Sequence, residues 1–183
     1  MLRIITLAIT LTTISCATDE TAKSNKENIT KSNTDIVTNS LSPCQLVDET
    51  EIKILFDIPA ATVTEIRDEV KTYPTCFYKW ETVTYSETKT ISNQVVNLDY
   101  PTEMMIVLVN NATPKMFDTS TKVYKDGISV SDIGEMAIWG EKMSQLTFLA
   151  KGSMIHLHVK KSSLASDNKE LALKIATIII NKL

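Results

Sequence analysis

The chain has 183 residues, of which 43% are hydrophobic, and its formal net charge at pH 7 is −3. This mildly acidic balance argues against nucleic acid as a partner. The chain has only four glycines and no Gly-x-Ser-x-Gly segment, so the sequence shows neither a phosphate-binding loop nor a nucleophile elbow. Residues 43–183 have the size of a single domain with a substantial core.

The first 15 residues follow the plan of a signal peptide. Arg3 supplies positive charge, and residues 4–14 form an apolar segment that is too short for a permanent membrane span. The residues before Cys16 resemble the bacterial lipobox, with Thr13 in place of the usual leucine. The resemblance implies that Cys16 is diacylated and anchors the mature protein to a membrane. Ordinary cleavage, which would give a soluble periplasmic protein, is the alternative.

Residues 16–42 are expected to provide the lipid attachment and a disordered tether. After Cys16 they are mostly threonine, serine, asparagine, lysine and acidic residues, without aromatic residues, glycine or proline. Such a segment buries too little apolar surface to offset the entropy lost on ordering. As a flexible coil it would reach roughly 25–30 Å, which lifts a domain clear of lipid headgroups.

The three cysteines are Cys16, Cys44 and Cys76. If Cys16 carries lipid, Cys44 and Cys76 remain as the natural pair in an oxidising compartment. We therefore expect a disulfide that joins the first helix to the first strand. Two unpaired buried cysteines are the alternative.

A short helix is expected at the start of the domain. Asp48 and Glu51 have capping-box spacing, and Ile52, Leu55 and Phe56 fall on one helical face. Pro59 ends this helix, because proline disfavours the helical conformation in the residue before it.

The run from 76 to 85 predicts the first strand, since it is rich in aromatic and β-branched residues. Alternation places Cys76, Tyr78 and Trp80 on one face, which we expect to be the core face, and the residues between them on the other. Residues 86–103 look like a loop, with Tyr100-Pro101 as a turn signal.

The central part of the chain predicts a strand followed by a short helix. The continuous apolar run at 104–109 favours a strand buried on both faces. Thr113-Pro114 favours the start of a helix, because proline is tolerated at the first helical position. The candidate buried residues of this region are Met116, Phe117, Val123 and Tyr124.

The last third predicts strands and a final helix. Gly134 marks a tight bend before a strand, and a hairpin is expected around Lys151-Gly152. Asp167 and Glu170 have capping-box spacing at the start of an amphipathic helix. Its expected apolar face comprises Leu171, Ile175, Ile178 and Ile179. The fold class expected from these elements is α+β, a mostly antiparallel sheet packed with an N-terminal and a C-terminal helix.

Several short motifs occur in an order that resembles a group of bacterial envelope lipoproteins of unknown function with a PsbP-like α/β sandwich. They are a Cys-x-Leu before a capped helix, a Cys-x-Tyr-x-Trp strand and a Gly-acid-x-Ala-x-Trp stretch. The matching residues are Cys44, Leu46, Cys76, Tyr78, Trp80, Gly134, Glu135, Ala137 and Trp139. The resemblance covers most of residues 43–183 and implies a sandwich fold and an envelope setting, but no catalytic residue.

No side chains in the sequence form a recognisable catalytic, cofactor-binding or metal site. His156 and His158, the only histidines, share one face of a strand. Two ligands do not make a zinc site, so a solvent-facing pair is favoured over a metal site. We expect Trp80 and Trp139 in the core, with a groove lining as the alternative.

Three functions remain open. The first is a non-catalytic binding or assembly module, lipid-anchored in a bacterial cell envelope at the periplasmic side or the surface, whose partner is a protein, a glycan or a lipid. The second is a carrier of an apolar ligand between sheet and helices, and the third is an uncharacterised hydrolase. Methionine makes adaptable apolar walls, which favours the carrier, although methionines also fill ordinary cores. The methionines concerned are Met104, Met105, Met116, Met136, Met143 and Met154.

Overall fold

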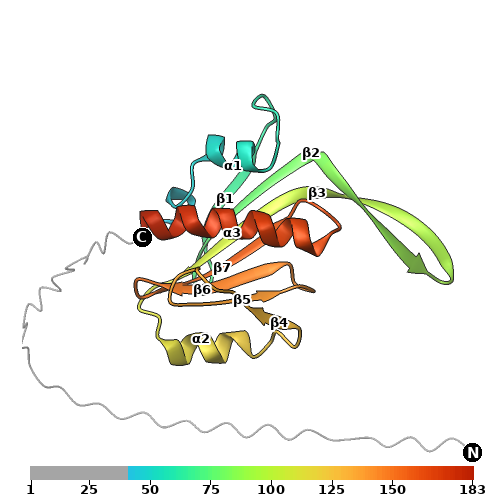
Figure 1. Cartoon of the computed structure of the whole chain (residues 1–183). Coiled ribbons are helices and arrows are strands. Elements are labelled where there is room, and N and C mark those ends of the chain that lie inside the picture. The colour runs from blue at the N-terminus through green and yellow to red at the C-terminus, as the bar shows by residue number, and fades with distance from the viewer. Residues whose placement is uncertain (1–40) are drawn as a thin grey trace, which may run out of the picture. The chain divides into compact units, whose positions relative to one another are not determined.

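The computed structural model describes residues 41–183 (Figure 1). The expected signal peptide, the lipidation site Cys16 and nearly all of the expected tether lie outside the described residues. In chain order the elements are η1 (Pro43–Gln45), α1 (Glu49–Leu55), β1 (Glu65–Val70), β2 (Pro74–Ile91), β3 (Gln94–Val109), α2 (Pro114–Thr121), β4 (Gly127–Ser129), β5 (Met136–Gly140), β6 (Gln145–Ala150), β7 (Ser153–Lys160) and α3 (Ala165–Lys182).

The strands form one seven-stranded sheet in the order β1-β2-β3-β7-β6-β5-β4. Every neighbouring pair is antiparallel. The predicted α+β class, with helices packed on a mostly antiparallel sheet, is confirmed. No helix within residues 41–183 is both long and apolar enough to cross a membrane.

Helices cover both faces of the sheet. On the first face, α1 and α3 pack on the main core, which includes Trp80 and Trp139 at 0% and 1% exposure. On the second face, Phe117 of α2 packs in a smaller cluster with Val109, Leu149 and Met154. Alternation along each strand divides its residues between these two clusters, because successive side chains point to opposite faces.

The beginning of the domain forms largely as expected. Asp48 caps α1, because its Oδ1 accepts hydrogen bonds from the backbone N–H groups of Thr50 and Glu51 at 2.9 and 3.3 Å. Just beyond the helix, Asp57 has a φ of 54°, a left-handed conformation that commonly terminates helices.

The disulfide between Cys44 and Cys76 is present, with the two Cα atoms 5.1 Å apart. Its expected location was wrong in detail, because Cys44 lies in η1 and Cys76 in β2. Two strands were not predicted from the sequence: the three-residue β4 and β1. Strand β1 is an exposed edge strand with four charged residues in six, EIRDEV. Charged residues on an edge strand discourage pairing with other chains, but they also conceal the alternating pattern of a buried strand.

The start of the last helix was also predicted incorrectly. Helix α3 begins at Ala165 and has no side-chain cap. Asp167 lies inside the first turn, where it accepts a hydrogen bond from Ser162 Oγ at 2.9 Å. The preceding loop is fixed instead by the buried Asn168, whose Oδ1 accepts from the N–H groups of Lys161 and Ser162.

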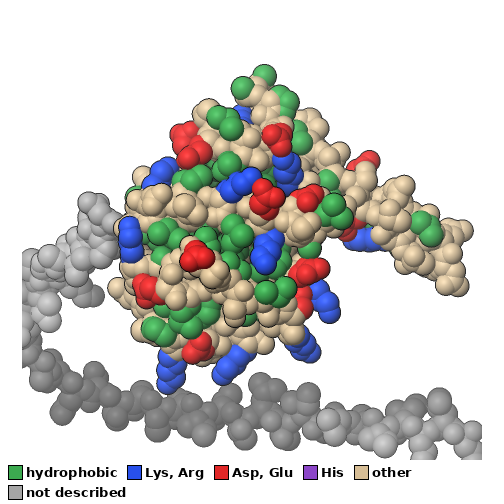
Figure 2. Space-filling model, viewed as in Figure 1, with side chains coloured by type: hydrophobic (Ala, Val, Ile, Leu, Met, Phe, Trp, Pro, Cys, Tyr) green, Lys and Arg blue, Asp and Glu red, His purple; other side chains and the backbone are tan. Residues whose placement is uncertain are grey.

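The largest error concerns residues 86–103, which are not a loop. Strands β2 and β3 continue past the sheet as a two-stranded arm (residues 84–101) that projects from the domain (Figures 1 and 2). Ser92 and Asn93 turn the chain at its tip with φ values of 50° and 64°, as a two-residue hairpin turn requires. The Tyr100-Pro101 step lies within β3.

The arm leaves the sheet at an irregularity in β2. Trp80 pairs with Thr102 and Thr84 with Pro101, so three residues of β2 have no partner in β3. A bulge of this kind bends the strand and increases its twist, which accounts for the change in direction seen in Figure 1.

Strand β3 was predicted to be buried on both faces, and it is fully buried on only one. Met104, Ile106 and Leu108 are 0–1% exposed beneath α1 and α3. Met105 and Val107 point to the second face, which α2 covers incompletely, and they remain partly exposed. This uncovered part of the second face borders the candidate site.

Candidate functional site

A groove lies between α2 and the second face of the sheet. Its volume is about 310 Å³, near the lower end of the range for small-molecule sites. We call it the α2 groove and define it by its lining residues, Tyr73, Thr113, Lys115, Met116, Thr119, Ser120, Met154 and His156. It lies outside the main core, which fills the space between the sheet and the other two helices.

The local sequence explains how α2 forms one wall of this groove. Thr113 caps the helix, because its side chain accepts a hydrogen bond from the N–H of Met116 at 3.3 Å. Phe117 fixes the helix to the sheet through the second-face cluster. Helical periodicity then places Lys115, Met116, Thr119 and Ser120 on the adjacent side, which borders the groove.

The floor of the groove comes from β7. Met154 and His156 are two residues apart and therefore point to the same face. Met154 is 2% exposed and belongs to the second-face cluster, so it gives this end of the floor an apolar character.

A chain of hydrogen bonds holds His156 from the side, through Thr147, its cross-strand partner on β6. Gln145 Nε2 donates to the hydroxyl of Tyr124 at 2.6 Å. The Tyr124 hydroxyl lies 2.7 Å from Thr147 Oγ1, which in turn lies 2.8 Å from His156 Nδ1. Burial raises the pKa of Tyr124 and lowers the pKa of His156, so both side chains are held in their neutral forms.

His158 has different partners. Its Nδ1 donates to the carbonyl oxygen of Met143 at 2.9 Å, and its Nε2 lies 3.5 Å from a carboxylate oxygen of Glu103. Hydrogen bonding to His158 lowers the pKa of Glu103, although burial acts in the opposite direction. The two imidazoles therefore face solvent only in part, because both are partly buried and each bonds to a protein group.

The two histidines do not form a metal site with neighbouring side chains. Across residues 41–183, no group of three or more histidine, cysteine, aspartate or glutamate side chains is placed to hold a metal ion. The sheet alternation did bring His156 and His158 to one face as expected, but their hydrogen bonds direct the rings to separate partners.

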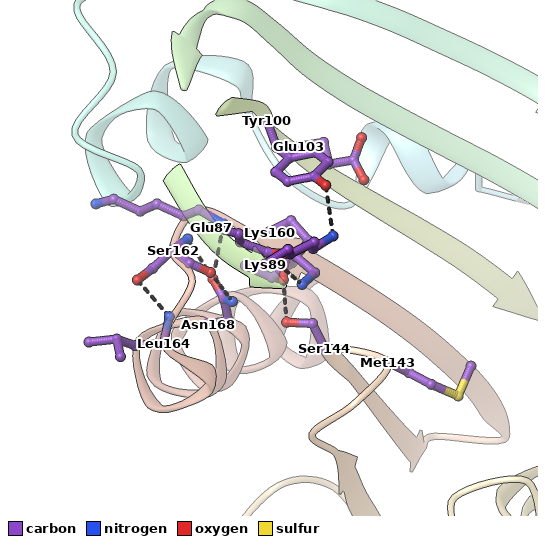
Figure 3. A network of polar contacts seen from close by, with 12 residues as sticks. Glu87, Lys89, Tyr100, Glu103, Met143, Ser144, Lys160, Ser162, Leu164 and Asn168 are labelled. Carbon is purple, nitrogen blue, oxygen red and sulfur yellow. Dashed lines mark hydrogen bonds and ion pairs between the residues drawn. The ribbon is translucent and has the colours of Figure 1, made fainter. Parts of the chain in front are cut away.

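A second polar cluster lies at the base of the arm, where Figure 3 shows Glu87, Lys89 and Lys160 close together. Lys89 Nζ lies 2.7 Å from the Tyr100 hydroxyl and 3.2 Å from Glu87, and Lys160 lies 3.4 Å from Glu87. Burial alone would raise the pKa of Glu87, but the two lysines lower it. These charges pair with one another, so the cluster braces the arm and presents no free charge to a ligand.

Another hollow, of about 270 Å³, lies between the end of α1 and the start of α3. Its two lysines are already paired: Lys161 with Asp57, and Lys174 with Glu170 at 2.8 Å. Asp167, the remaining charged residue of its lining, accepts a hydrogen bond from Ser162 Oγ. By contrast, Lys115 at the α2 groove forms no ion pair with any carboxylate in the described part of the chain.

The sequence analysis identified only part of the groove. It noted Met116, Met154 and His156, but it expected Met116 to be buried, whereas this side chain is 37% exposed at the groove wall. Trp80 and Trp139 are core residues, as expected, and do not line the groove. The groove residues that were missed are Tyr73, Thr113, Lys115, Thr119 and Ser120. The i, i+4 spacing of Lys115 and Thr119 was the one available signal.

No family model, curated protein or solved structure matches this chain. Functional inference therefore depends on the geometry of the described residues and on the signals in the N-terminal sequence.

Proposed function

We propose that this protein is a lipoprotein of a bacterial cell envelope, anchored by lipid at Cys16, whose domain is a non-catalytic binding module. The observation that carries the proposal is the α2 groove, an open hollow with apolar walls and a few polar groups. Binding sites for small molecules have this composition. The domain would use the groove while a tether holds it away from the membrane.

Two observations support the envelope setting. The N-terminal residues follow the plan of a signal peptide that ends at a cysteine. The Cys44–Cys76 disulfide suits an exported protein, because such bonds persist in oxidising compartments.

Helices on both faces of the sheet also agree with a PsbP-like sandwich, which we propose as the finer fold assignment.

The surroundings of His156 support binding in preference to hydrolysis. Covalent catalysis needs a nucleophile that can reach the substrate and a base beside it. The hydroxyl that contacts His156 belongs to Thr147, which is 0% exposed and cannot meet a substrate. Among the residues that line the α2 groove there is no carboxylate to orient the imidazole.

A carrier of an apolar ligand is the second candidate. It is favoured by Met116 and Met154, which contribute adaptable apolar surface to the groove. A carrier would be purified with its apolar ligand still bound, whereas a module that senses or presents a ligand would exchange it readily.

The anchor is tested by fractionating cells that produce the Cys16→Ala variant. We expect this variant to leave the membrane fraction and appear in the soluble envelope fraction. Retention of the variant in membranes, or an intact mass showing unmodified Cys16 in the native protein, would contradict lipidation.

The binding role is tested with a photo-reactive amino acid placed in the full chain at position 116, inside the groove. A matched control carries it at position 177, which is exposed on α3. We expect a discrete adduct at position 116 and none at 177. The proposal fails if position 116 gives no adduct. It also fails if the purified protein turns over an esterase, peptidase, glycosidase or phosphatase substrate and loses that activity in the His156→Gln variant.

A further inference from the structure

The side chains that line the α2 groove include a positive charge and no negative charge. Lys115 contributes a cation, and Tyr73, Thr119 and Ser120 contribute hydroxyl groups, while no aspartate or glutamate lines the groove. Asp118 belongs to the same helix, but it does not line the groove and forms no ion pair with Lys115. A ligand with a positive charge would find no partner here, whereas a negative charge would meet Lys115.

The hydrogen-bond chain beside the groove bears on which nitrogen of His156 carries its proton. Gln145 donates to Tyr124, so the single proton of Tyr124 is free to go to Thr147. The next hydrogen bond joins Thr147 Oγ1 and His156 Nδ1, and its direction depends on the tautomer of His156. When Tyr124 donates to Thr147, the Thr147 hydroxyl donates to Nδ1, which is then the acceptor. A neutral imidazole with a lone pair on Nδ1 carries its proton on Nε2.

The Nε2–H group is open to the groove. His156 Nε2 has no hydrogen-bond partner among residues 41–183, whose side-chain bonds to His156 involve only Nδ1. Every buried side-chain nitrogen or oxygen in that range has a hydrogen-bond partner. Because Nε2 has none, it is not buried and is accessible to solvent. Since His156 lines the groove, the tautomer with its proton on Nε2 gives the floor a hydrogen-bond donor, and the bond between Nδ1 and Thr147 fixes the orientation of the ring.

The walls favour an apolar body beside this donor. Met116 is 37% exposed and Tyr73 is 42% exposed, so both present apolar surface to a ligand. Met154 continues this surface along the floor next to His156. Burying such surface against a ligand favours binding in proportion to the apolar area removed from water.

The geometry points to a small organic acid as the ligand of the α2 groove, with its carboxylate between Lys115 and His156 Nε2–H and its apolar body against Met116 and Met154. This inference rests on the proposed function and specifies its ligand class. A carboxylate accepts hydrogen bonds only, which matches the Nε2–H group of His156 and the cation of Lys115. The Thr119 hydroxyl already donates to the Lys115 carbonyl oxygen, so it takes no part in this match. A hydrogen bond to a charged acceptor is also stronger than one to a neutral acceptor.

The experiment uses the exported full-length Cys16→Ser protein, which avoids detergent in the groove. Isothermal titration compares octanoate, octanol and octylamine, which share one apolar chain and differ in the head group. We expect octanoate to bind, octanol to bind at least about tenfold more weakly, and octylamine not to bind. Octanoate affinity should fall as the salt concentration rises, because Lys115 is exposed.

Three variants test whether octanoate binds in the α2 groove. Lys115→Gln and His156→Gln should each weaken octanoate binding by about tenfold, whereas Lys122→Gln, at the end of the same helix, should leave it unchanged. Lys115 and Lys122 are both exposed, so their variants are expected to fold, and the comparison holds even if His156→Gln unfolds the domain. Equal binding of all three probes, or octanoate binding that is unchanged in Lys115→Gln, would overturn the inference. If octanoate fails to bind while a discrete adduct still forms at position 116, the organic acid is excluded but the binding module stands.

Discussion

Removing the Cys44–Cys76 disulfide should destabilise the domain more than most single substitutions. The bond joins η1 to β2 across 32 residues of sequence. Cys76 is fully buried, so substitution is a cleaner perturbation than a reductant. The variant is Cys44→Ala with Cys76→Ala, compared in a Cys16→Ser background so that no free thiol remains.

The magnitude follows from the size of the closed loop. In the chain-entropy model, a loop of this length restricts the unfolded chain by about 4 kcal/mol at 25 °C. A domain of this size unfolds with an entropy of about 0.3 kcal/mol per degree, so the melting temperature should fall by roughly 12 °C. In the folded variant, one contact still holds η1 to β2. The Tyr78 hydroxyl donates to the backbone carbonyl oxygen of residue 44, 3.3 Å away, and this bond does not depend on the cysteine side chain.

Urea unfolding followed by circular dichroism measures the effect directly, with a thermal melt as the second measurement. The reasoning predicts a lower urea midpoint, together with a higher slope, because the unlinked chain exposes more surface on unfolding. A loss of less than about 1 kcal/mol would refute the argument that the bond acts by restricting the unfolded chain.

Three further predictions concern other parts of the domain. Gly134→Ala should lower the free energy of unfolding by at least about 2 kcal/mol, because φ is 58° there and a Cβ atom would collide with the Leu149 carbonyl oxygen. Gly152→Ala, where φ is 73° but the space is open, should lower it by less in the same urea titration. Burial lowers the pKa of His156 below its ordinary value of 6.5. On acidification, His156 therefore takes up a proton at a higher pH in the unfolded chain than in the folded domain. The free energy of unfolding should therefore fall as pH drops below about 6.5, by at most about 1.4 kcal/mol per pH unit, and an unchanged pH profile in His156→Gln would contradict this. Replacing arm residues 88–97 by a two-residue turn should shift the melting temperature by only a few degrees, because most of these side chains are exposed; a larger fall would show that the arm supports the core.

The sequence predicted the elements whose residues alternate between core and solvent. The strand face formed by Cys76, Tyr78 and Trp80 is buried as expected, at 0%, 2% and 0% exposure. The hairpin at Lys151-Gly152 forms with φ values of 49° and 73°. Local patterns suffice in these cases, because burial on one face and turn chemistry are both encoded within a few residues.

The arm could not be predicted in this way, because its polar side chains resemble those of a loop. Strands 84–91 and 94–101 pair with each other and extend beyond the helices, so neither face needs a continuous apolar row. The arm does carry a short signal in Val96, Leu98 and Tyr100, which alternate and share a face. Tyr100 stacks with Tyr85 at 5.9 Å between ring centroids, a contact that only the hairpin register brings about.

The α2 groove depends on contacts that are distant in sequence. Tyr73 precedes β2, while Met116 follows β3 and His156 lies in β7, so only the sheet order brings them together. The same holds for the hydrogen-bond chain, in which Tyr124 and Thr147 are 23 residues apart. In the sequence, Thr147 is one of many threonines and carries no distinguishing pattern.

The requirement for a hydroxyl at position 147 appears only in the folded domain. Thr147 is fully buried, and a buried hydroxyl is costly unless it is hydrogen-bonded. It avoids that cost by hydrogen bonding to both Tyr124 and His156, and the same two bonds fix the imidazole that forms the groove floor. The stability of β6 and the direction of the donor in the groove therefore depend on one side chain, which links the packing of the second face to the ligand that this face can bind.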